Sequence, residues 1–149
     1  MIASDDLHTL QLAPLWVLSA LSGTHAGFER HELDAFWDTV VAVCLRTPGT
    51  AQQVLQTLTE DRSGLVLDYE LDDRSVVTGL THVVAALDRL DPATAYDFKI
   101  ALLRIGVGMG RARGPYGRSV SSRDEQTLLL VAELLEIRRT PSVGDNVFV

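Results

Sequence analysis

The chain has 149 residues, of which 46% are hydrophobic, and its 13 Lys and Arg residues against 20 Asp and Glu residues give a net charge of −7. This apolar content excludes an intrinsically disordered chain, and a protein of this length buries roughly 68–70% of its unfolded surface, which suffices for one core. The negative charge argues against nucleic acid as a partner, because an acidic chain repels the phosphate backbone.

The first residues and the only cysteine indicate the compartment. Met1–Asp6 is acidic where a secretory signal is basic, and the chain has no run of about 18 apolar residues that would span a bilayer. We therefore expect a cytoplasmic protein without a membrane span. Cys44 has no second cysteine to pair with, so the sequence excludes an intrachain disulfide and a CxxC zinc pair.

Apolar residues at spacings of three and four predict the first two helices. A leucine-rich stripe predicts a helix over about 13–23, which places Pro14 in the first turn, where proline is tolerated. This helix is expected to end at Ser22–Gly23. The second helix follows Phe28, which is placed to pack against Leu33 as a hydrophobic staple.

Proline, glycine and polar residues delimit the next segments. Pro48–Gly49 ends the second helix, and Thr50 is the expected N-cap of a short third helix that stops in the polar run 59–64. Residues 65–71 alternate apolar and acidic side chains near their end, but a lone strand would have no partner in this chain. We therefore predict a connecting segment or a short helical turn at 65–71.

Aspartates mark the starts of two further helices. Asp72 or Asp73 is the predicted cap of a helix that carries apolar residues to Leu87. Asp91–Pro92 combines an N-cap with a proline at the first helical position, and the helix that follows is expected to continue to about Arg111.

Alternating glycines and a capping box characterise the C-terminal part. Gly106, Gly108 and Gly110 each weaken a helix, so their alternation predicts either a close approach by another helix or an early helix end. Ser121 with Asp124 three residues later has the pattern of a capping box before a broad apolar face. The last helix is therefore expected to begin there.

These patterns predict an all-α protein with one domain of about six to seven helices over residues 1–137, followed by a tail at 138–149. The two halves repeat weakly, because residues 24–32 and residues 113–124 each lead from an apolar helix through a glycine loop to an apolar residue and a first-turn acid. The matching pairs are Phe28 with Val120 and Glu32 with Asp124. The repeat predicts two pseudo-repeated helical hairpins packed face to face.

These motifs resemble the TerB-like family of helical proteins associated with tellurite resistance, whose two halves each carry a helix, an Asp-Gly loop, an apolar residue and a first-turn Glu or Asp. The resemblance runs from about Leu12 to Leu135 and implies the TerB-like helical fold. It also implies a divalent cation held by acidic residues, of which Glu32 and Asp124 match. The neighbouring candidate ligands are Glu29, His31 and Glu125.

Two positions depart from the family pattern. Ala26 and Arg113 stand where the family carries its loop aspartates. A divalent cation requires several oxygen ligands, and an arginine in the loop places positive charge where the ion would lie. The replacements argue against metal binding in the family manner, and the sequence leaves open whether the site was lost or has moved.

The start of the second helix also suggests a metal site without reference to any family. Glu29 and Glu32 share one helix face, and with His25 and His31 they form a mixed nitrogen and oxygen set that suits Zn²⁺ or Mn²⁺. The alternative is that the two carboxylates stabilise the helix N-terminus and the histidines are solvated, because first-turn acids are favoured without any function. We favour this alternative on the sequence alone.

The acidic stretch around residues 68–73 fails as an EF-hand calcium loop. Counting from Asp68, the positions that need Gly and the bidentate Glu are occupied by Asp73 and Gly79. The stretch is expected to be a solvated acidic turn, or else an acidic docking surface for a basic partner, whose binding would weaken with salt.

The glycines at 106–110 lead into an arginine-rich loop that contains Arg111, Arg113 and Arg118. The loop lacks the GK[ST] ending of a P-loop, which argues against nucleotide binding. It is expected either to be a helix end in which arginines interact with the helix C-terminus or to be a docking site for an anion or a protein partner.

The predicted function is non-enzymatic, since no Ser, Cys or Thr stands in a recognisable catalytic motif. The family resemblance implies a cytoplasmic protein of stress or tellurite-resistance responses that acts through protein contacts and through a divalent cation where its site is retained. One alternative is a small metal-dependent or anion-binding enzyme that uses Glu29, His31, Glu32 and Asp124. The other is a purely structural interaction module; the protein partner and the oligomeric state are not specified by the sequence.

Overall fold

The computed structural model of the chain describes residues 2–25, 27–114 and 119–137, and within these ranges all regular structure is helical. The predicted all-α architecture of six to seven helices is confirmed, because the described residues form seven helices around one hydrophobic core. The predicted tail at 138–149 lies outside the described residues. The helices are α1 (Ser4–Ser22), α2 (Arg30–Leu45), α3 (Gly49–Leu58), α4 (Arg62–Leu71), α5 (Val76–Leu87), α6 (Pro92–Arg113) and α7 (Ser122–Leu134).

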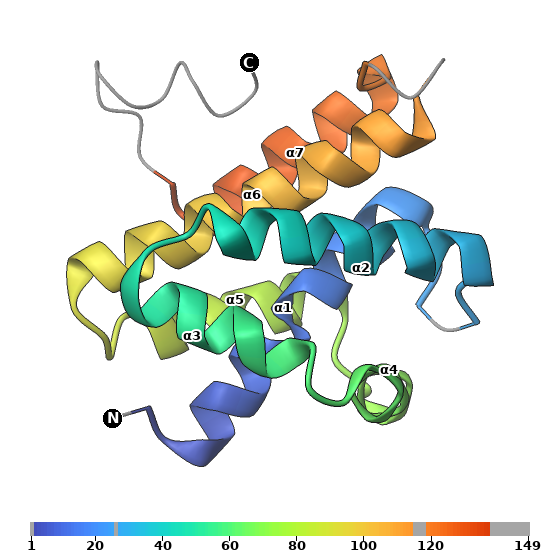
Figure 1. Cartoon of the computed structure of the whole chain (residues 1–149). Coiled ribbons are helices and arrows are strands. Elements are labelled where there is room, and N and C mark those ends of the chain that lie inside the picture. The colour runs from blue at the N-terminus through green and yellow to red at the C-terminus, as the bar shows by residue number, and fades with distance from the viewer. Residues whose placement is uncertain (1, 26, 115–118, 138–149) are drawn as a thin grey trace.

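Helix α1 lies at the centre of the fold. It packs against α3, α4, α5, α6 and α7, and in Figure 1 it passes between the α6–α7 pair and the shorter helices α3 and α4. An unbroken run of its residues, 12–19, is buried, so this part of α1 is surrounded by protein on every side. The other helices bury one face each on this central helix or on α6.

The start of α1 was predicted wrongly. The helix begins at Ser4 rather than near residue 13, so Pro14 lies in the helix interior and not in the first turn. Proline there removes the backbone N–H that would bond to the carbonyl of Leu10. The burial of Pro14 and its neighbours against five helices offsets that loss. The predicted end is confirmed, because Gly23 caps α1 with a φ of 70° and donates its N–H to Ser19.

The N-terminus of α3 also differs from the prediction. The helix starts at Gly49, where φ is 63°, and its N-cap is Pro48, which provides no side-chain hydrogen bond. Thr50 is therefore inside the helix and does not cap it. Upstream, Phe28 and Leu33 are both partly buried against the core, as the predicted staple requires.

The segment at 65–71 is fully helical, so the prediction of a connecting segment or a single turn was wrong. Asp61 caps α4 by accepting a hydrogen bond from the backbone N–H of Gly64. Leu65 and Tyr69, four residues apart, are buried on one face, which is a helical spacing that Asp68 between them and Glu70 after them disguised. Figure 1 shows α4 end-on at the edge of the bundle.

Of the predicted caps of the next two helices, that of α5 was wrong and that of α6 is confirmed. Ser75, and neither Asp72 nor Asp73, caps α5 by accepting from the backbone N–H of Thr78. Asp91 caps α6 as predicted, with proline at the first helical position.

The glycines of α6 mark close packing and not an early helix end, since α6 continues to Arg113. A Cβ atom on Gly106 would collide with Leu128 of α7, and one on Gly108 would collide with Thr39 of α2. Small residues therefore let α2 and α7 approach α6 closely. Among the described residues, none of the helices has the length and apolar character needed to cross a bilayer.

Candidate functional site

The two first-turn acids that match between the halves meet at one arginine. Glu32 and Asp124 are each the third residue of their helix, α2 and α7, and Arg113 is the last residue of α6. The Arg113 Nη1 atom lies 3.3 Å from Glu32 Oε2, and its Nε atom lies 3.3 Å from Asp124 Oδ2. One guanidinium group therefore joins the ends of three helices.

Burial of the Asp124 carboxylate explains why this cluster contains an arginine. The Asp124 side chain is only 6% exposed, so its charge needs a partner, and Arg113 provides two-sided pairing to both acids. Ser121 accepts a hydrogen bond from the backbone N–H of Asp124, which confirms the predicted cap. Arg113 thus brings positive charge to the point between the two carboxylates.

The other predicted ligands do not join this pair. Glu29 and His31 lie 3.2 Å from each other with side chains 75% and 82% exposed, and Glu125 is also exposed. Among the residues with described positions, no three His, Cys, Asp or Glu side chains gather as a metal site would require. Of the predicted docking arginines, Arg111 is exposed, Arg113 forms the cluster above, and Arg118 lies outside the described residues.

Replacing Arg113 with methionine is expected to lower the free energy of unfolding by about 1–2 kcal/mol, because the Asp124 carboxylate would remain buried without its cation. Urea unfolding monitored by circular dichroism measures the change. The matched control is Arg111→Met, an exposed arginine in the same helical turn, which should change stability by less than about 0.5 kcal/mol. Equal losses in the two variants would contradict the role of Arg113 as a connector.

A second polar cluster, which the sequence analysis did not predict, surrounds Arg74. Its guanidinium group binds both carboxylate oxygens of Asp72, at 2.8–3.2 Å, and also bonds to Thr9 and His82. The same group lies 4.8 Å from the ring centre of Trp16, whose buried Nε1 has no hydrogen-bond partner in the described structure. Thr9 and Trp16 are far from Arg74 in sequence, so local spacing gave no signal of this cluster.

The Arg74 contacts predict a specific pH dependence. Hydrogen bonding to Arg74 lowers the pKa of Asp72 below its ordinary value of 3.8. The resulting stabilisation is present above about pH 4 and is lost as the pH falls through the lowered pKa of the folded state. We expect Asp72→Asn to be less stable than the wild type at pH 7 and the difference to shrink below pH 4 in urea titrations. The control is Asp73→Asn, at an exposed neighbour with no ion pair among the described residues, which should change stability at pH 7 by less than about 0.5 kcal/mol.

Tyr69 is the anchor that joins α4 to the loop before α2. Its hydroxyl group shares a hydrogen bond with Ser19, and its ring lies 5.0 Å from that of His25 and 5.9 Å from that of Phe28. The Glu70 carboxylate accepts a hydrogen bond of 2.9 Å from the Gly27 backbone. Burial raises the pKa of Tyr69, so this hydroxyl stays protonated and serves as a structural group.

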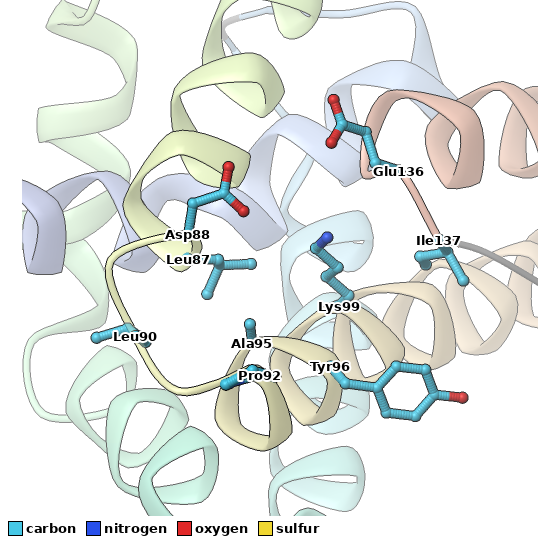
Figure 2. A pocket seen from close by; sticks show the side chains of 9 residues that line it. All are labelled: Leu87, Asp88, Leu90, Pro92, Ala95, Tyr96, Lys99, Glu136 and Ile137. Carbon is cyan, nitrogen blue, oxygen red and sulfur yellow. The ribbon is translucent and has the colours of Figure 1, made fainter.

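A cavity of about 440 Å³ lies near the N-terminal part of α6 and is shown in Figure 2. Lys99 points toward the space between Asp88 and Glu136, and the cavity is lined by apolar and polar side chains together. Lys99 and Arg113 are separated by fourteen positions of α6, which corresponds to about 20 Å along the axis. The cavity and the Glu32–Arg113–Asp124 cluster are therefore separate places.

The comparisons with known proteins give no further assignment. No protein-family model, no curated protein and no solved structure gives a significant match to this chain.

Proposed function

We propose that the protein is a non-enzymatic, TerB-like cytoplasmic protein that acts in stress or tellurite-resistance responses through contacts with other proteins. The observation that carries the proposal is the position of Arg113 between Glu32 and Asp124. A guanidinium group already neutralises the two acids that match between the halves, so they connect helices and are not left open as ligands.

Exposed apolar side chains are available for such contacts. They occur on α2, α4, α5, α6 and α7, on surfaces that no described helix covers. An interaction protein needs such groups, because their burial against a partner contributes to the free energy of binding. The largest exposed fractions are those of Leu45, Leu71 and Leu130.

Thermal unfolding of chelator-treated protein tests the proposal against the metal-dependent alternative. Adding Ca²⁺, Mg²⁺, Mn²⁺ or Zn²⁺ is expected to leave the melting temperature unchanged. A cation that binds the folded protein and is present at about 100 times its Kd would instead raise the free energy of unfolding by about 2.7 kcal/mol and the melting temperature by several degrees. A rise that disappears in the Glu32→Ala, Asp124→Ala double variant would overturn the proposal in favour of a working metal site.

The physiological part of the proposal is tested in the cells from which the protein comes. Deletion of its gene is expected to lower survival under tellurite, and both the wild type and the Arg113→Lys variant should restore it. The lysine keeps a positive charge between Glu32 and Asp124, so the two acids still need no metal ion to balance their charge. Unchanged survival after deletion would contradict the stress role.

A further inference from the structure

Helix α4 presents an apolar surface that no other described helix covers. Leu67 and Leu71 are 56% and 76% exposed and lie one helical turn apart, so they share a face. The opposite face of α4 carries the buried Leu65 and Tyr69 and packs mainly on α1. The two large leucines form an apolar patch on a peripheral helix, and burying such a patch against a partner is favourable.

The charges beside these leucines define the chemistry of that partner. Asp68 lies next to Leu67, and Asp73 is the second residue after Leu71, at which the helix ends; both are exposed, and the described structure shows no ion pair to either. The two nearby arginines have other contacts, because Arg62 lies over the Trp37 ring and Arg74 binds Asp72. Within the described residues, the leucine pair is therefore flanked by negative charge that no ion pair neutralises.

From these observations we propose that the outer face of α4, formed by Leu67, Asp68, Leu71 and Asp73, binds a basic amphipathic helix of a partner protein. The partner's apolar residues would pack on the two leucines, and its Lys or Arg residues would pair with the two aspartates. The negative charge disfavours an anionic membrane surface or a nucleic acid as the occupant. This inference rests on the proposed function and names the partner chemistry of one contact surface.

A labelled synthetic helix tests the site directly. The probe carries leucines at helical spacing flanked by lysines, and fluorescence anisotropy follows its binding to the full chain. We expect binding that weakens several-fold between about 0.05 M and about 0.5 M NaCl, as screening of the aspartates requires. The Leu67→Ser, Leu71→Ser double variant should bind at least about tenfold more weakly, because it loses most of the apolar contact.

One control variant and two control ligands test whether binding depends on the α4 face. Leu45→Ser changes an equally exposed leucine, 77% exposed on α2, that is followed by the exposed Arg46, and should leave binding unchanged. Binding that is lost equally in Leu45→Ser, or that is as strong for a probe with glutamates in place of lysines, would overturn the site. If anionic phospholipid vesicles bind more tightly than the basic probe, the proposal that the occupant is a protein would be overturned.

Photo-crosslinking in cells separates the failure of this site from the failure of the proposed function. A photoreactive residue at position 67 is expected to form adducts with a partner, while one at position 45 serves as the comparison. Adducts at position 45 alone would overturn the α4 site and leave a role in protein contacts intact. Adducts at neither position would count against both.

Discussion

Replacing Tyr69 with alanine is expected to lower the free energy of unfolding by about 3–5 kcal/mol, a large part of the total of about 5–15 kcal/mol for a domain. The side chain is fully buried, contacts the Trp16 ring edge at a centroid distance of 6.2 Å, and bonds to Ser19. Its removal leaves a cavity where α4, α1 and the loop before α2 meet. Urea unfolding of both proteins measures the loss.

Tyr69→Phe separates the ring from the hydroxyl group. The phenylalanine keeps the packing against Trp16 and loses only the hydrogen bond to Ser19, which still donates to the Thr24 carbonyl at 2.8 Å. We therefore expect a loss of about 1 kcal/mol, well below that of the alanine variant. Similar losses in the two variants would show that the hydroxyl group, and not the buried ring, holds α4 in place.

Replacing Gly79 with valine is expected to lower the free energy of unfolding by about 2–3 kcal/mol, at the upper end of the usual cost of overpacking. Gly79 lies on α5 where that helix packs on α1, and any Cβ atom there would overlap the Trp16 indole. Trp16 is fully buried, so the indole has no free space into which it can turn. The two helices would have to separate.

Two comparisons establish that the indole causes this loss. Val77→Ala alters an exposed position of the same helix and should change stability by less than about 0.5 kcal/mol. In a Trp16→Phe background the smaller ring leaves room, so Gly79→Val should cost less than it does in the wild type. Additive losses in the double variant would place the strain elsewhere.

Helix content was predictable where caps and apolar spacing agree. Asp91–Pro92 and Ser121 each combine a side-chain cap with an apolar stripe, and both begin helices as predicted. The failures occurred where tertiary packing prevails over local preference. Pro14 is accepted inside α1 because the stretch 12–19 is buried on all sides, and no local pattern reports burial by distant helices.

Helix α4 shows a second limit of sequence analysis. Asp68 and Glu70 interrupt its apolar residues, and its N-cap, Asp61, lies in the polar run 59–64, which was expected only to end the preceding helix. The sequence therefore showed no clear start for a helix with the spacing of Leu65 and Tyr69. Asp72 likewise has the residue type of a cap, but its side chain pairs with Arg74, and the shorter Ser75 takes the capping position.

For the candidate site, the sequence identified the residues Glu32, Arg113 and Asp124 but not the ion pairs that they form. The internal repeat matched Glu32 with Asp124, and the structure connects this pair through Arg113. The arginine was recognised as a departure from the family pattern that brings positive charge to the site. Its contact with both acids depends on how α2, α6 and α7 converge, which no sequence spacing specifies. The metal-binding and docking predictions remain predictions.

The central position of α1 has a consequence during synthesis of the chain on the ribosome. Residues 4–22 emerge before the helices that bury them, because α5 and α6 begin only at Val76 and Pro92. Until α6 has left the exit tunnel, Trp16 and the leucines of α1 lack most of their packing partners. We therefore expect the nascent chain to expose an apolar N-terminal helix for most of its synthesis, which makes it a substrate for chaperones that guard unfinished chains.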